Sequence, residues 1–213
     1  MMLDVSRRQC VIVGGGRVAA RKARGLLAAG AQNVRVVSPV FADDIPPGVQ
    51  RIAEAYEPRH LSGASLVFAA TDSTQVNQAV VRDAQSLGAL ACRADADDET
   101  PGDFTTPALH REGLIFVAVS AAGSPALAAA VRDELAQHLD LRWKRLAQTV
   151  LNWRPVLRDR SSLPPARRRA LMGELAGRDA LALLDSGGPQ ALWRWIAQRY
   201  PELKNLPCPP TDG

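Results

Sequence analysis

Short apolar runs alternate along the first two thirds of the chain with segments in which apolar residues recur every three or four positions. Such runs are typical of strands buried in a parallel sheet, and the longer spacing is typical of helices. The pattern therefore predicts an α/β domain with a parallel sheet. The predicted strands are residues 9–13, 34–37, 52–56, 65–70, 89–92 and 114–120, and the predicted helices are residues 17–29, one that includes 76–81, and 126–139.

From about residue 141 onward the apolar spacing is helical only. Trp143, Leu146 and Val150 follow this spacing, and all four tryptophans of the chain lie in this part. Tryptophans at helical spacing usually belong to a core, so we predict a helical domain here with these tryptophans in its core. We divide the chain into an α/β domain (1–112), a linking segment (113–140) and a basic helical domain (141–213).

Three consecutive glycines, Gly14, Gly15 and Gly16, join the first predicted strand to the first predicted helix. A strand, a glycine turn and a helix place free backbone N–H groups at a helix N-terminus, where a pyrophosphate binds. Gly14 would make the turn, Gly16 would let the phosphates approach, and the small Ala19 would let the helix pack on the strand. The motif predicts a dinucleotide site; the alternative is a glycine-rich turn of another α/β fold.

The ends of two other predicted strands add to this site. The second strand ends at Ser38 and Pro39 without the acidic residue that binds the ribose in many NAD sites. Ser38 can bond a ribose hydroxyl instead, and no arginine follows directly to favour NADP, so we expect NAD. Thr71 and Asp72 follow the most apolar strand, at the sheet edge where ligands bind, although they can equally cap the next helix.

Five carboxylates occur within the nine residues 95–103. A solvated acidic turn is the ordinary interpretation, and a catalytic carboxylate beside the nucleotide is the alternative. His60 is predicted to lie in a loop at the surface, without a catalytic role.

Charge is distributed unevenly over the chain, whose formal net charge is +4. Residues 1–140 hold 13 Lys and Arg against 16 Asp and Glu, whereas residues 141–213 hold 13 against 6. The basic last third suits an anionic partner, or it is a solvated arginine-rich face. Nucleic acid is the least favoured partner because no binding motif is present.

Nothing in the composition points to a membrane or to a metal centre. No apolar stretch is long enough to span a bilayer, and no signal peptide is recognisable at the N-terminus. The three cysteines lack metal-ligand spacing and fit reduced thiols. We therefore expect a cytoplasmic protein with no resident metal.

Taken together, these segments resemble the precorrin-2 dehydrogenase family, which forms the dehydrogenase and ferrochelatase module of siroheme synthases. The motifs follow the family's order from residue 8 to about 140. They comprise residues 11–23, 37–39, 68–72 with 76–77, 97–98 with 102–104 and 107, and 117–120 with 123–127. The resemblance implies a Rossmann-like NAD domain, a segment that forms a homodimer, and a helical region that helps to enclose a tetrapyrrole.

The activity implied by the resemblance is oxidation of precorrin-2 to sirohydrochlorin, with hydride transfer to NAD⁺. Some members of the family also insert Fe²⁺ to give siroheme. Alignment backward from residues 103, 104 and 107 assigns the catalytic carboxylate to Asp97, whereas alignment forward from Cys92 assigns it to Asp95. A carboxylate there can accept the proton that must leave with the hydride. A sensor of NAD(H) that does no chemistry is the alternative, but it has no need of Asp97.

The resemblance also assigns binding residues. The substrate-binding residues are Ser120, Gly123 and Ser124, in a loop (120–125) that is one residue shorter than in the family. Because precorrin-2 carries eight carboxylates, the three arginines at 167–169 are predicted to face it. The chain would act without the methyltransferase domain of fused siroheme synthases. The cofactor-binding residues are Gly14, Gly15, Gly16, Arg17, Val18, Ser38, Pro39, Ala70, Thr71 and Asp72.

Overall fold

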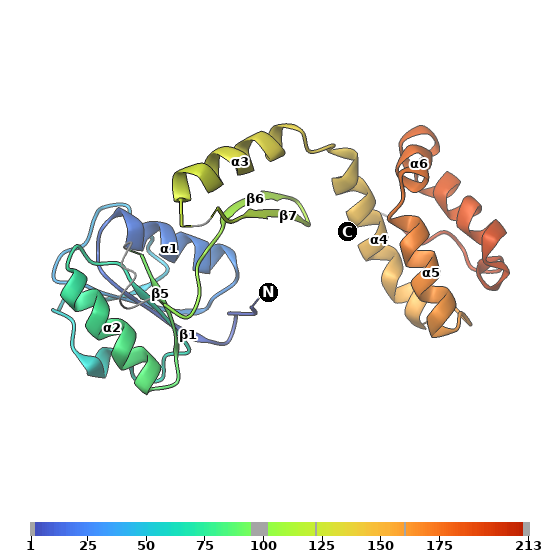
Figure 1. The fold of residues 1–213 in the computed structure, drawn as a ribbon. Coiled ribbons are helices and arrows are strands. Elements are labelled where there is room, and N and C mark those ends of the chain that lie inside the picture. The colour runs from blue at the N-terminus through green and yellow to red at the C-terminus, as the bar shows by residue number, and fades with distance from the viewer. Residues whose placement is uncertain (1–2, 95–101, 122, 160, 211–213) are drawn as a thin grey trace. The chain divides into compact units, whose positions relative to one another are not determined.

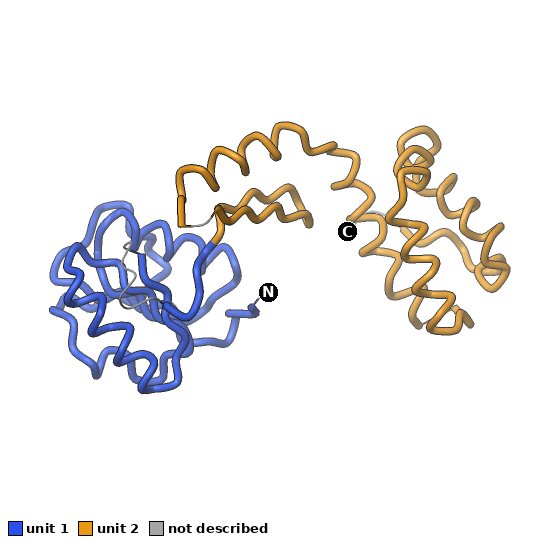
Figure 2. Tube along the Cα trace, in the orientation of Figure 1, with its two compact units in different colours: residues 1–106 blue, residues 107–213 orange. Residues whose placement is uncertain are grey.

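The computed structural model describes residues 3–94, 102–121, 123–159 and 161–210. The chain divides into two compact units, Met1–Thr106 and Pro107–Gly213, which Figure 2 shows in different colours. Each unit has its own hydrophobic core and is described by itself. The domain boundaries inferred from the sequence, at 112 and 140, remain predictions.

The first unit, in which Figure 1 labels β1 and β5, contains a parallel sheet of five strands in the order β3-β2-β1-β4-β5. All four pairs of neighbouring strands are parallel. The predicted α/β, Rossmann-like class is therefore confirmed. Four of the five strands expected in this part of the chain are present within one residue of their predicted bounds, but the strand predicted at 52–56 is wrong in its bounds, because β3 ends at Ile52. The bounds of the five strands are β1 Gln9–Val13, β2 Asn33–Val37, β3 Gln50–Ile52, β4 Leu66–Ala69 and β5 Leu90–Arg93.

Helices cover both faces of this sheet. Alternate residues of β1 point to opposite faces, as the pleat requires. Cys10 and Ile12 pack with α1 (Arg17–Ala28), whereas Val11 and Val13 pack with α2 (Thr74–Ser86). A short 3₁₀ helix, η1 (Pro58–Leu61), lies in the crossover between β3 and β4 and buries Leu61 beside α2.

The strand order places a topological switch at β1. The chain runs outward from β1 to β2 and β3, and it then crosses back so that β4 pairs with the other side of β1. Sheets of this kind bind ligands in the crevice outside the carboxyl ends of the strands at such a switch. The residues that follow β1, β2 and β4 are therefore the candidates for a ligand-binding site.

The second unit begins with an antiparallel hairpin of β6 (Ala108–Glu112) and β7 (Ile115–Val119), against which α3 (Pro125–Gln137) packs. The strand β7 and the helix α3 were predicted, but β6 was missed. Its sequence ends in His110, Arg111 and Glu112, and a strand with so many polar residues shows no apolar run.

Three helices and a short 3₁₀ turn complete the second unit. Trp153 is fully buried in their core, and its ring meets that of Trp193 edge-on at 5.0 Å. The prediction that these tryptophans form a helical core is confirmed. None of the described helices combines the length and the apolar character needed to cross a membrane. The elements are α4 Arg142–Asp159, α5 Pro165–Leu175, α6 Arg178–Arg199 with a break at Gly188, and η2 Pro201–Leu203.

Candidate functional site

Gly14 and Gly15 pack so closely against neighbouring atoms that a larger residue does not fit at either position. Gly14 has a φ of +125°, which favours glycine. A Cβ on Gly14 would lie closer than 3.0 Å to the carbonyl oxygen of Ala70, and one on Gly15 would lie equally close to the carbonyl oxygen of Val40. Since both obstacles are backbone atoms, these two glycines allow the chain segments after β1, β2 and β4 to meet.

Gly16 differs because its surroundings are open. A Cβ at this position would meet no atom within 4 Å. Gly16 is the extended N-cap residue of α1, and among the described residues no side chain caps this helix. The first N–H groups of α1 are therefore left for a ligand, beside the half-buried Val18 and the exposed Arg17, which has no polar partner in the described part of the chain. The residues present fit the pyrophosphate of a dinucleotide.

Ser38 and Pro39 follow β2, and the chain then folds back over the glycine loop. The Ala42 N–H donates to the carbonyl oxygen of Gly15 at 2.8 Å. The Ser38 hydroxyl donates to the carbonyl oxygen of Val40 at 2.7 Å, so its single proton is in use. Its lone pairs remain able to accept a hydrogen bond from a sugar hydroxyl.

Ala70, Thr71 and Asp72 follow β4 on the other side of the switch. The Ala70 N–H donates to the carbonyl oxygen of Val13 at 2.8 Å, which holds this segment beside the glycine loop. Thr71 is half-buried and Asp72 is exposed. The alternative in which Thr71 or Asp72 caps α2 is wrong, because Ser73 is the N-cap residue and its hydroxyl accepts from the Val76 N–H at 3.3 Å.

Asp95 and Asp97 lie outside the described residues, but the segments on either side of them are well anchored. Before them, the Ala94 N–H donates to the carbonyl oxygen of Ala69 at 2.9 Å. After them, Asp103 bonds β5 twice at Ala91. Its N–H donates to the Ala91 carbonyl oxygen, and its carboxylate accepts from the Ala91 N–H at 2.8 Å. Both ends of the acidic segment are thus attached to the β4–β5 side of the sheet.

Ser120, Gly123 and Ser124 belong to the second unit, in the connection between β7 and α3. Gly123 has a φ of +81°, and Ser120 and Gly123 are exposed. Ser124 is the N-cap residue of α3, and its hydroxyl accepts from the Leu127 N–H at 3.4 Å. Ser124 therefore has a structural use besides the substrate contact that is predicted for it.

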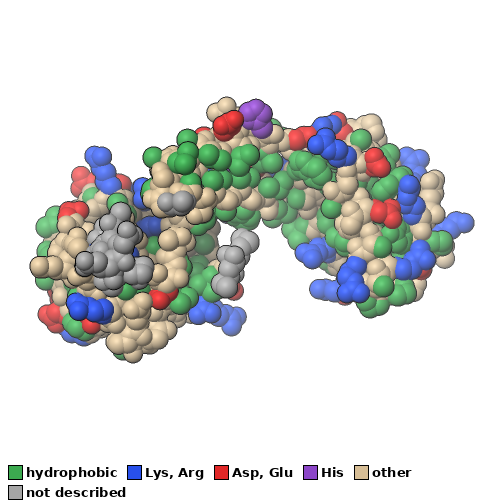
Figure 3. Space-filling view, in the orientation of Figure 1, with side chains coloured by type: hydrophobic (Ala, Val, Ile, Leu, Met, Phe, Trp, Pro, Cys, Tyr) green, Lys and Arg blue, Asp and Glu red, His purple; other side chains and the backbone are tan. Residues whose placement is uncertain are grey.

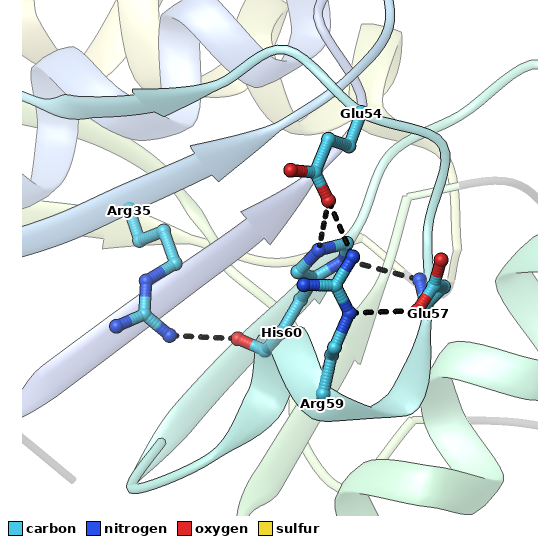
Figure 4. Close-up of polar contacts among 5 residues, drawn as sticks. All are labelled: Arg35, Glu54, Glu57, Arg59 and His60. Carbon is cyan, nitrogen blue, oxygen red and sulfur yellow. Dashed lines mark hydrogen bonds and ion pairs between the residues drawn. The ribbon is translucent and has the colours of Figure 1, made fainter.

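His60 was predicted to lie at the surface, and that prediction is wrong because only 4% of the residue is exposed. Its Nδ1 accepts from the Glu57 N–H at 3.0 Å, and its Nε2 lies 3.1 Å from a Glu54 carboxylate oxygen (Figure 4). Arg59 forms ion pairs with both glutamates, and its guanidinium holds the pKa of Glu57 below its usual range. Since Arg35 also bonds the His60 carbonyl oxygen at 2.8 Å, this group fixes η1 on the sheet.

Lys22 is an ionisable residue of α1 for which the sequence suggested no role. Its ammonium group donates to the Thr106 hydroxyl and lies 5.7 Å from the centre of the Phe68 ring. Burial lowers the pKa of Lys22, and burial raises the pKa of the nearby Cys92 thiol. Together with the edge-on contact between Phe68 and Phe104 at 5.5 Å, Lys22 attaches the end of the first unit to α1.

The arginines at 167–169 differ in their surroundings. Arg167 forms an ion pair with Glu202 at 3.2 Å and lies over the Tyr200 ring. Arg168 donates to the Leu163 carbonyl oxygen at 3.1 Å. Arg169 is exposed and has no hydrogen bond or ion pair among the described residues. The prediction that all three face a ligand is therefore supported by free surface only at Arg169.

The chain resembles known proteins in sequence and in fold. A family model described as "Putative NAD(P)-binding" matches residues 1–108. The solved structure of SirC, a precorrin-2 dehydrogenase, superposes with a TM-score of 0.74 at 21% identity, covering 93% of this chain and 98% of the other. At this identity, the structural likeness shows a shared fold.

Curated siroheme synthases are similar in sequence. That of Chromobacterium violaceum is 36% identical over 79% of this chain and 37% of its own length. That of Nitrosospira multiformis is 33% identical over 100% of this chain and 46% of its own length. The chain thus spans less than half the length of these relatives.

Proposed function

The chain belongs to the putative NAD(P)-binding family and is a relative of siroheme synthases, and on this premise we propose that it oxidises precorrin-2 to sirohydrochlorin. The family resemblance drawn from the sequence motifs is confirmed, as is a nicotinamide dinucleotide as the cofactor. The observation that carries the proposal is the glycine loop at the β1–β4 switch, where the start of α1 is open to a pyrophosphate.

We further propose NAD rather than NADP. The Ser38 hydroxyl has donated its proton to Val40, so it can only accept from a sugar hydroxyl. The 2′-phosphate of NADP accepts hydrogen bonds, and it would face the lone pairs of the Ser38 hydroxyl instead of a donor. The segment that follows Ser38, residues 39–45, contains no arginine or lysine that could pair with such a phosphate.

The reaction removes one hydride and one proton from precorrin-2. Bound NAD⁺ supplies the acceptor for the hydride. The start of α1 binds and orients the cofactor, and Asp97 accepts the proton as a general base. The reaction then balances as precorrin-2 and NAD⁺ giving sirohydrochlorin, NADH and a proton.

Asp97→Ala tests this assignment in a turnover assay. Precorrin-2 and NAD⁺ are mixed with the enzyme, and sirohydrochlorin absorbance is followed. We expect the variant to lower kcat by roughly 10²–10⁴-fold, the contribution of a general base, with an unchanged Kd for NAD⁺. Asp95→Ala is the matched control and should retain activity. A wild-type protein that binds NAD⁺ but forms no sirohydrochlorin would refute the proposed reaction.

Insertion of Fe²⁺ into the product is a further activity that the sequence resemblance implies. No group of three metal-ligating side chains lies together in the described part of the chain, which does not include residues 95–101. Iron would then be handled as a substrate. Addition of Fe²⁺ to the same assay tests the step through the spectrum of siroheme.

We also propose that Arg169 binds a substrate carboxylate. Together with Arg168, Pro165 and Met172, it lines a cavity of about 400 Å³. Arg169→Ala should raise the KM for precorrin-2 several-fold while leaving the Kd for NAD⁺ unchanged, because only a substrate contact is removed. Arg167→Ala is the control, since that side chain is already paired with Glu202. An unchanged KM in Arg169→Ala would contradict the assignment.

We also propose that two copies of the chain form a homodimer through their second units. Hydrophobic side chains gather over α3 and the β6–β7 hairpin (Figure 3). On α3, Leu127, Val131 and Leu135 recur at intervals of four residues and are 55%, 37% and 48% exposed. A contiguous apolar stripe of this kind marks an interaction surface, and a second copy of the chain offers the same stripe.

A further inference from the structure

Asn77 is a fully buried polar residue, with 0% of its surface exposed, at the start of α2. Within the described part of the chain, every hydrogen bond of its side chain is to one residue, Thr71. The side-chain oxygen Oδ1 accepts from the Thr71 N–H at 3.0 Å, and Nδ2 donates to the Thr71 carbonyl oxygen at 3.0 Å. The amide of Asn77 thus pairs with the main chain of Thr71 as a neighbouring strand would.

The same amide also engages the Thr71 side chain. The Thr71 hydroxyl lies 2.8 Å from Asn77 Oδ1 and 3.1 Å from the Ser73 carbonyl oxygen, and it accepts from the Ser73 N–H at 3.2 Å. The N–H, the carbonyl and the hydroxyl of Thr71 are therefore all used within the protein. Both donors of Thr71 are thus used within the protein, so it has no hydrogen left to donate to a ligand, and its position is what it mainly contributes to a ligand site.

That position matters because Thr71 follows Ala70, which forms one wall of the crevice. The Ala70 carbonyl oxygen packs against Gly14 with no room for a Cβ, so a small movement of the Ala70–Thr71 peptide changes the space beside the glycine loop. Among the described residues, the backbone hydrogen bond that holds Ala70 in the sheet is the one from its N–H to Val13. In the described part of the chain, the side chain that bonds the Ala70–Thr71 peptide group is that of Asn77, through the Thr71 N–H.

We propose that Asn77 is a positioning residue for the cofactor, which fixes the wall of the crevice formed by Ala70 and Thr71 before the dinucleotide binds. The proposal rests on the dinucleotide site and is independent of the reaction proposed above. Without Asn77 the wall adopts its binding conformation only part of the time, and the apparent Kd rises in inverse proportion to that fraction. A wall formed a tenth of the time gives a tenfold weaker Kd.

The test measures the Kd for NAD⁺ of the full chain by calorimetry, together with the Tm of the free protein and amide exchange at Thr71. Asn77→Ala should raise the Kd about tenfold, and the Thr71 amide should lose its protection. Tyr56→Phe is the matched control, because it removes the hydrogen bond between Tyr56 and Asp83 on the same helix, remote from Thr71 in sequence. It should lower the Tm to a similar degree and leave the Kd unchanged.

Thr71→Val keeps the proposal falsifiable if Asn77→Ala fails to fold. It removes the hydroxyl but retains both main-chain bonds to Asn77, so we expect a two- to threefold rise in Kd. In the double variant this change should add nothing to Asn77→Ala, because the two residues act as one unit. A Kd within twofold of wild type in Asn77→Ala, an unchanged Kd in Thr71→Val, or an equal rise in Tyr56→Phe would overturn the proposal.

Because these readouts do not use turnover, they separate this inference from the proposed reaction. A wild type that binds NAD⁺ without oxidising precorrin-2 would refute the reaction and still allow the role of Asn77 to be measured.

Discussion

The cores of the two units are built from side chains of different size. That of the first unit consists mainly of valine and alanine, whereas that of the second consists of leucines packed around Trp153 and Trp193. Small side chains allow backbone segments to approach closely, as they do at Gly14 and Gly15. Large side chains each fill a large volume. The first unit should therefore be sensitive to added atoms and the second to removed atoms.

The largest effect is expected where an atom is added to the glycine loop. In Gly15→Ala the new Cβ would collide with backbone after β2, so we expect the Kd for NAD⁺ to rise by at least roughly 100-fold, or the unit not to fold. Gly16→Ala is the control for the fold, since a Cβ there meets no atom. Its Tm should be unchanged while NAD⁺ binds more weakly. Normal binding by Gly15→Ala would contradict the packing of the loop.

Removal of atoms is tested at Trp153. Trp153→Ala should lower the free energy of unfolding of the second unit by about 3–5 kcal/mol, measured by urea denaturation, while the Kd for NAD⁺ stays close to wild type. Trp153→Phe is the milder control. It keeps an aromatic ring and removes an indole N–H that has no hydrogen-bond partner among the described residues, so its cost should be much smaller. A parallel loss of NAD⁺ affinity would show that the units depend on each other.

Added charge on the apolar stripe of α3 should affect association and leave both cores intact. Val131→Lys should weaken the proposed dimer at least about tenfold in dissociation constant, as measured by sedimentation equilibrium, because a charge would be buried there. Leu87→Lys is the control at an exposed apolar residue of the first unit. A wild type that sediments as a monomer at every concentration would remove the dimer from the proposal.

The smallest effect concerns one tyrosine in each unit. Burial, together with a bond to Asp83, raises the pKa of Tyr56, and burial together with Glu174 raises that of Tyr200. Above about pH 10 the unfolded chain loses the phenolic proton while the folded chain keeps it, so stability should fall as the pH rises. Tyr56→Phe should flatten this decline in urea denaturation more than Tyr200→Phe, since Arg167 and Arg199 oppose the shift at Tyr200. Equal slopes in all three proteins would contradict the assignment.

Much of the first unit could be predicted because its strands are buried on both faces. The apolar run of β1 was predicted with the bounds that the structure shows, Gln9–Val13. The glycine loop could also be predicted, since its residue types are required by its backbone geometry. β6 could not, because three of its five residues, His110, Arg111 and Glu112, are polar and leave no apolar run.

Side-chain hydrogen bonds between residues three to six positions apart were beyond prediction. His60 is buried because the Glu57 N–H and the Glu54 carboxylate satisfy its ring nitrogens, and no periodicity reveals such a group. The pairing of Asn77 with Thr71 was likewise hidden, although both residues were part of the quoted motifs. The role of Ser73 as the cap of α2 was missed because Thr71 and Asp72 are equally good capping types.

The hydrogen bonds of Asp103 also protect the protein against aggregation through the edge of its sheet. β5 is the outer strand of the sheet, and an open strand edge is a template on which another chain can add a strand and start an aggregate. At Ala91 both main-chain groups of that edge are already paired with Asp103, and Gly102 packs so closely on the strand that a Cβ there would lie 2.6 Å from the Ala91 carbonyl oxygen. At the opposite edge, β3 is only three residues long. The sheet is thus protected at both margins, which steers self-association away from strand addition.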